Sequence, residues 1–150
     1  KKKHVFDDDL IALVDDALAS GSDRIQVKSL RVIAGTEGPQ QADLTVTVDG
    51  VERSAQAKGD GPVDAVFNAI HEAVPHEAVL RLFQVHAVTE GTDAQAQVSV
   101  RLEEDGRIAT GQAADTDTLT ASAKAYVNAL NNLFARKEKS APDARVASGF

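Results

Sequence analysis

Residues 57–70 read AKGDGPVDAVFNAI, and they change the chain from an alternating strand into an amphipathic helix. Gly59 and Gly61 allow a tight turn with positive φ and leave room for a ligand near the main chain. Pro62 suits the first helical position, where its missing N–H costs nothing. Because a helix start exposes N–H groups and the positive end of the helix dipole, this corner is a candidate carboxylate or phosphate site. The alternative is a plain strand-to-helix turn.

The pattern around this corner occurs twice along the chain. Apolar and polar residues alternate in three segments, and a helical apolar stripe follows each set of three. The expected strands are 25–32, 44–48 and 51–57, then 79–88, 94–102 and 107–113, and the expected helices are 63–74 and 119–134. The sequence therefore predicts an α+β fold of two β-β-β-α units, about 25–75 and 78–134, related by a pseudo-two-fold axis.

Short local signals fix the joints between these elements. Asp49-Gly50 and Asp105-Gly106 are hairpin dipeptides, because both residues tolerate positive φ. The inward-facing set of the first strand changes near Ser29, which indicates a bulge. The segment Asp115-Thr116-Asp117 is expected to cap the helix that follows.

The two ends of the chain differ from this repeat. Apolar residues at helical spacing from Leu10 to Leu18 follow three aspartates, so we expect a short linker helix within 1–21. The domain proper then spans 22–136, and 137–150 are expected to be a disordered tail because charge, Ser and Pro occur there without a period. The chain contains no methionine, which leads us to expect a piece excised from a longer protein.

Composition narrows the class of protein. The 150 residues are 43% hydrophobic and 26% charged, as in a globular domain. A net charge of −7 disfavours binding to nucleic acid, and no apolar run approaches the about 20 residues of a membrane helix. Without a signal peptide or cysteines, a cytoplasmic location is expected. Sheet edges or helix faces left uncovered would favour a homodimer.

Catalytic chemistry has little support in this sequence. The four histidines lack a metal-ligand spacing, and no nucleophile elbow or P-loop is present, so we assign no catalytic residue and no metal ligand. His71 and His76 are expected at the surface. Three small residues lie on the strands of the second unit, Ala87, Ala94 and Ala96. They leave space either for close packing of a helix or for a small ligand, to which Leu80 and Phe83 would offer apolar walls.

Three motifs in order resemble those of one known family. GDGPVDA (59–65) resembles the glycine corner of the C-terminal regulatory domain of 2-isopropylmalate synthase, and GTDAQA (91–96) is similar to its hairpin turn. TAS (120–122) and AYVNALN (125–131) look like its last helix. The resemblance extends over about 6–134, and three motifs at matching separations are far more specific than the glycine corner alone.

The resemblance implies a domain that binds L-leucine between its two units, next to both helix starts, and that dimerises. Main-chain N–H groups would bind the carboxylate of the ligand, and carboxylate side chains or carbonyls would bind its ammonium group. Small apolar residues would contact its isobutyl group. Carried over by motif, the ligand-binding residues would be Gly59, Asp60, Gly61, Val63, Leu80, Phe83, Ala87, Ala94, Ala96, Asp117 and Thr118.

The same resemblance implies a parent enzyme that this chain does not contain. That parent would be an acyltransferase joining acetyl-CoA to 2-oxoisovalerate in a catalytic barrel with a divalent metal, so no cofactor is expected here. Two alternatives stay open. One is an isoleucine-sensing regulatory domain of citramalate synthase. The other is a dimerisation module without a ligand, which is favoured by Ala113, since the family tends to have glycine there.

Overall fold

The structure is a computed structural model that describes residues 23–87 and 94–148. The expected linker helix within 1–21 and the turn at 91–93 lie outside these residues. The elements follow one another as three strands and a helix, twice, which confirms the predicted α+β class. They are β1 (Ile25–Ile33), β2 (Gln40–Val48), β3 (Val51–Gly59), α2 (Pro62–Ala73), β4 (Val79–Ala87), β5 (Ala96–Glu104), β6 (Arg107–Asp115) and α3 (Thr118–Ser148).

Each unit contains an antiparallel three-stranded sheet, β1-β2-β3 in the first and β4-β5-β6 in the second. The second and third strands are joined by the predicted two-residue hairpins. Asp49 and Gly50 have φ of 52° and 82°, and Asp105 and Gly106 have φ of 52° and 78°. Two successive positive φ angles match the right-handed twist of the flanking strands, which is why Asp-Gly is favoured there.

The first strand of each sheet contains an irregularity. The register of β1 shifts between Val27 and Ser29, which confirms the predicted bulge. A shift between Leu80 and Leu82 also occurs in β4, although no residue pattern in that segment indicates a bulge. One extra residue re-aims the side chains that follow it, so Leu80 and Phe83 both lie opposite inward-facing residues of β5.

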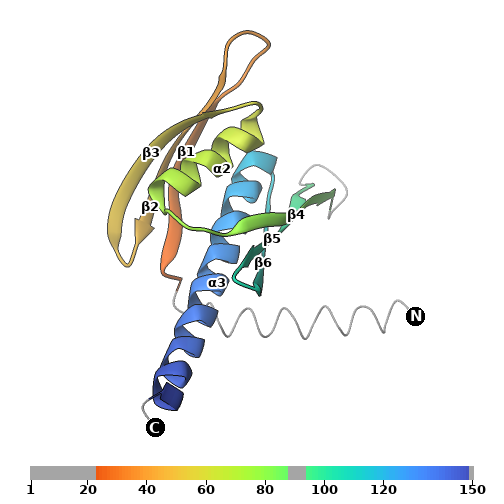
Figure 1. Cartoon of the computed structure of the whole chain (residues 1–150). Coiled ribbons are helices and arrows are strands. Elements are labelled where there is room, and N and C mark those ends of the chain that lie inside the picture. Colours follow the sequence, from red (N-terminus) through yellow and green to blue (C-terminus); the bar gives the residue numbers. More distant parts are fainter. Residues whose placement is uncertain (1–22, 88–93, 149–150) are drawn as a thin grey trace, which may run out of the picture.

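The core lies between the two sheets, which flank the helices (Figure 1). Helix α2 packs on β2 and β3 of its own unit. Helix α3 packs on β5 and β6 and also reaches β1 of the first unit. The central strands supply alternating buried residues to this core, as a sheet with one covered face requires: Ala42, Leu44, Val46, Val98, Val100 and Leu102.

Helix α3 covers the outer edge of β6 as well as its face. Three side chains spaced four residues apart donate to alternate main-chain carbonyls of that strand. Four helical residues rise about 6 Å and two strand residues about 6.8 Å, so the two repeats match. Because these edge carbonyls already accept hydrogen bonds, they are not available to pair with another strand. The pairs are Asn128 to Gln112 at 2.9 Å, Asn132 to Thr110 at 2.6 Å, and Arg136 to Ile108.

The end of α3 differs from the sequence prediction. A disordered tail was expected at 137–150, whereas the backbone is helical to Ser148. Ala, Arg, Lys and Glu are frequent in this segment and are good helix formers. A segment that extends an existing helix does not have to nucleate a new one, so it can be helical without an apolar stripe of its own. Apolar periodicity alone therefore does not indicate such an extension.

Candidate functional site

The start of α2 is the first half of the predicted site. Gly61 is its N-cap residue, with φ −154° and ψ 173°, and no side chain caps this helix end. The Gly61 carbonyl accepts the first helical hydrogen bond, from Ala65 N–H at 2.9 Å. Asp64 turns back, so that its carboxylate accepts from Asp60 N–H at 2.9 Å. Without a cap, the first-turn N–H groups are available to an external anion.

The two glycines of this corner have different roles. We expected positive φ at both, and this is wrong, because the described glycines with positive φ are Gly38, Gly50 and Gly106. A Cβ on Gly59 would collide with the backbone of Ala65, so glycine is needed there for close approach of strand and helix. Nothing lies within 4 Å of a Cβ built on Gly61. The open space of the corner is therefore at Gly61.

The start of α3 forms the second half of the predicted site, and it is capped. The Asp117 carboxylate accepts from Leu119 N–H at 3.3 Å and from the Thr120 hydroxyl at 2.6 Å, so the cap expected within 115–117 is made by Asp117. Asp115 accepts from Asp117 N–H at 2.9 Å, and this bond lowers the pKa of the Asp115 carboxyl below its usual value. Thr118, the first helical residue, is exposed. The two helix starts thus differ in their free hydrogen-bonding capacity.

Sheet register brings part of the predicted apolar wall to the start of α3. Ala87 lies opposite Ala96, and Ala96 lies opposite Asp115, so all three are at one end of the second sheet. Ala94 is exposed just before β5. Leu80 is seven residues from Ala87 along β4, about 23 Å at strand rise, and so lies toward the other end.

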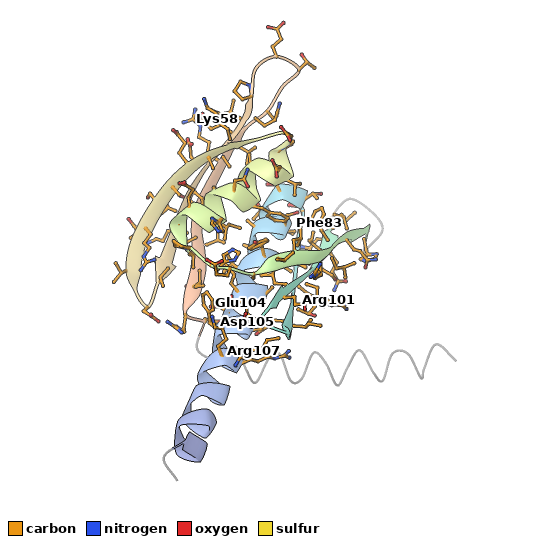
Figure 2. The ribbon with its side chains drawn as sticks, in the orientation of Figure 1. Lys58, Phe83, Arg101, Glu104, Asp105 and Arg107 are labelled. Atoms are coloured by element: carbon orange, nitrogen blue, oxygen red, sulfur yellow. The ribbon has the colours of Figure 1, made fainter. Side chains whose placement is uncertain are left out.

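Phe83 connects the second sheet to both helices. Its ring meets the Phe67 ring edge-on, at 5.5 Å between centroids, and Phe67 stacks at 4.6 Å on Tyr126 of α3. Phe67 is one helical turn after Val63, so Val63 and Phe83 approach the same side of α2. Figure 2 shows Phe83 projecting from β4 in the upper part of the sheet, with Glu104 well below it.

The polar groups beside Tyr126 were missed by the sequence analysis. We expected His76 at the surface, and this is wrong, since it is half-buried with its Nε2 3.2 Å from the Tyr126 hydroxyl. Burial and then the neighbouring His71 lower the pKa of His76 to about 4. Burial raises the pKa of Tyr126 to about 12. The one feature of the sequence that could have pointed to this polar cluster is that Tyr126 is the sole tyrosine of the chain.

A hollow of about 290 Å³ lies between the two units, where β1, β6 and α3 meet. None of the eleven predicted ligand-binding residues lines it. Helix α3 contributes Lys124, Val127 and Asn128 to its lining. The other lining residues come from β1, β6 and the segment before β1: Asp23, Ile25, Gln26, Val27, Gln112 and Ala113.

Metal and membrane features were also sought. Within residues 23–87 and 94–148, no three or more His, Asp or Glu side chains are grouped so as to hold a metal ion. No helix in the same ranges is long and apolar enough to cross a membrane.

Comparison with known proteins gives consistent matches. The family model described as the LeuA allosteric (dimerisation) domain matches residues 4–134. The chain is 80% identical over its full length to 2-isopropylmalate synthase of Caulobacter vibrioides (strain NA1000 / CB15N) and 58% identical over 99% of its length to that of Nitrobacter hamburgensis. It spans 28% of each of these relatives. The chain therefore belongs to the LeuA allosteric (dimerisation) domain family.

Proposed function

We propose that this chain is the leucine-sensing, dimerising part of a 2-isopropylmalate synthase. The observation that carries the proposal is the uncapped start of α2 with open space at Gly61, in a chain whose family is allosteric. An uncapped helix start offers N–H groups to a carboxylate, and every amino acid carries one. The other predicted residues remain part of the proposed site, except Leu80, which lies toward the other end of β4.

The rest of the ligand can be assigned from the same geometry. The Asp117 carboxylate already accepts two hydrogen bonds at its own helix start, so we assign the ligand ammonium group to Asp60 and to main-chain carbonyls. The isobutyl group would contact Val63 and Phe83, with Ala96 leaving room beside them. In feedback inhibition, leucine would bind the inhibited arrangement better than the active one, with a coupling of about 1–3 kcal/mol.

The dimer surface that we propose is the uncovered face of β4. Leu80 and Val85 lie opposite the buried Leu102 and Val98, on the face that the helices cover elsewhere. They are nevertheless 40% and 45% exposed, because α2 and α3 pack on other strands. An apolar strip of this kind on a dimerisation domain fits a second copy of the chain.

The parent activity belongs to this proposal too. Since the chain spans 28% of its relatives, acyl transfer from acetyl-CoA to 2-oxoisovalerate, with its divalent metal, is assigned to a catalytic barrel outside these residues. The role left to this chain is effector binding and association, without a cofactor of its own. A cytoplasmic location follows from the same assignment.

Calorimetric titration of the chain with L-leucine, L-isoleucine and D-leucine tests the proposal. We expect saturable binding that prefers L-leucine. A preference for L-isoleucine would reassign the parent to citramalate synthesis, since leucine and isoleucine differ only in branch position, worth about 1–3 kcal/mol in an apolar pocket. No binding by a folded dimer would leave a structural dimerisation module and refute the sensor function.

A further inference from the structure

A second hollow, of about 300 Å³, is lined by none of the predicted ligand-binding residues. It forms where the segment joining α2 to β4 meets the end of β5 and the middle of α3. Its lining carries two carboxylates, one ammonium group, two imidazole rings and one phenyl ring. The lining residues are His71, Pro75, His76, Glu77, Glu104, Phe134 and Lys137.

Glu104 is the central group of this hollow. It is 8% exposed and continues the inward-facing series of β5 at a position where the pattern calls for an apolar residue. Its Oε2 accepts from Lys137 Nζ at 2.5 Å. Its Oε1 is buried and has no hydrogen-bond partner among the described residues. An orphaned carboxylate oxygen is costly, and native proteins supply such an atom with a donor.

The neighbouring histidines do not supply that donor. Ala78 N–H donates to Nδ1 of His76 at 3.1 Å, so the ring proton is on Nε2. That Nε2–H faces the Tyr126 hydroxyl at 3.2 Å. With these two contacts, both ring nitrogens of His76 have a hydrogen-bond partner, and the ring is held neutral. The Nε2 atom of His71 is hydrogen-bonded to the His76 carbonyl at 3.0 Å.

The charge of the hollow favours one more cation. By formal charge, with histidine counted as neutral, Glu77 and Glu104 contribute two negative charges to the lining and Lys137 one positive charge, which leaves one negative charge without a counter-charge among the lining residues. The Phe134 ring already faces two cations, since Lys137 Nζ and the Arg24 guanidinium lie 5.9 and 6.0 Å from its centroid, so the attraction for a further cation comes from the carboxylates. Metal coordination does not fit, because no three ligand side chains are suitably grouped in the described residues.

We propose that this hollow binds a small ammonium cation, either free ammonium or the primary ammonium head of a short alkylamine. One N–H donates to Glu104 Oε1, and Glu77 balances the positive charge. This ligand supplies both missing properties, a hydrogen-bond donor and a single positive charge. Potassium supplies the charge without the donor, which provides a chemical control.

Titration of the chain at constant ionic strength tests the proposal. The probes are ammonium chloride, methylammonium chloride and potassium chloride, and the readouts are the NMR signals of the Glu104 carboxyl carbon and the Phe134 ring. We expect saturable shifts with the first two salts. Tighter binding of methylammonium would assign the site to alkylamines, and tighter binding of ammonium to the free ion. An equal response to potassium, or no saturable shift, would overturn the proposal and leave Oε1 hydrated.

Two variants with the same loss of charge locate the site. Glu104→Gln is expected to weaken ammonium binding about tenfold or more, because a charged acceptor is lost. Glu103→Gln on the same strand also loses one carboxylate and one ion pair, to Arg81 at 2.8 Å, and should bind normally. Should Glu104→Gln fail to fold, the exposed Glu77→Gln replaces it, with weaker binding expected. Equal affinity of the cavity variant and the Glu103→Gln control would refute the proposed location.

Discussion

Asn131 and Ile25 exchange two hydrogen bonds of 2.8 Å, although 106 residues separate them. Ile25 N–H donates to the amide oxygen of Asn131, and the Asn131 amide donates to the Ile25 carbonyl. The side chain thus pairs with the backbone of β1 as a neighbouring strand would. Both residues are buried, so this contact fastens the helix of the second unit to the first strand of the first unit.

Asn131→Ala should destabilise the chain by about 2–4 kcal/mol, because it leaves a buried N–H and a buried carbonyl without partners. Asn68→Ala provides the matched control. Asn68 is exposed and donates to the Lys58 carbonyl at 2.9 Å, so we expect a loss of about 0.5–1 kcal/mol. Urea unfolding measures both, and equal losses would contradict the role given to Asn131.

Gly111→Ala should lower the stability of the fold by more than the addition of one methyl group usually does. A Cβ at this position would collide with the Ala125 carbonyl oxygen and the Ala129 nitrogen, and backbone atoms of a packed helix cannot move aside cheaply. We expect a loss of about 2–4 kcal/mol in urea unfolding. Gly35→Ala is the control, since nothing lies within 4 Å of its Cβ, and its change should stay within about 0.5 kcal/mol.

Gly61→Asp should abolish leucine binding without harming the fold. The added carboxylate would occupy the open space at the start of α2 and repel the ligand carboxylate, so affinity should fall at least about tenfold. The Gly61 backbone is extended, and Asp is a favoured N-cap residue, so the melting temperature should be unchanged or higher. Calorimetry and thermal unfolding measure the two effects. Retained leucine binding would remove Gly61 from the site, and Gly35→Asp controls for the added charge.

Val85→Glu should shift the chain from dimer to monomer in sedimentation equilibrium. A charge in the apolar strip of β4 would be desolvated on association, which costs several kcal/mol without a partner. Val51→Glu makes the same change on the first hairpin, where Val51 is 61% exposed, and should leave the dimer intact. A dimer that tolerates Val85→Glu would place the interface elsewhere.

Stability should depend on pH through His76. Its pKa in the folded chain, about 4, is below the ordinary 6.5, so the unfolded chain binds the proton more readily. The stabilisation is therefore complete above pH 6.5 and is lost as the pH falls from 6.5 toward 4. The loss should reach about 1–2 kcal/mol, since the ring is only partly shielded from water.

Urea unfolding at pH 7 and pH 5 measures this dependence. His76→Gln should remove most of it by removing the titrating ring. His86→Gln changes an exposed ring on β4 and should leave it unaltered. An unchanged pH dependence in His76→Gln would assign the effect to other groups.

Much of the fold could be predicted because its signals are local. Alternation at period two, the Asp49-Gly50 and Asp105-Gly106 hairpins, the bulge near Ser29 and the Asp117 cap all depend on residues a few positions apart. Of the proposed site, the sequence located the uncapped start of α2. The register then placed Ala87 and Ala96 beside the start of α3, which the strand pattern alone did not specify.

The order of elements and the two repeated units follow from the sequence alone, since backbone preferences and apolar spacing act along the chain. The need for glycine at positions 59 and 111, the burial of His76 and the orphaned oxygen of the buried Glu104 follow only from the packing of the folded chain. Each of these properties arises from a helix docking on a strand or segment distant in sequence. The distance between two such elements is set by the packing of the whole core, and no local pattern records it.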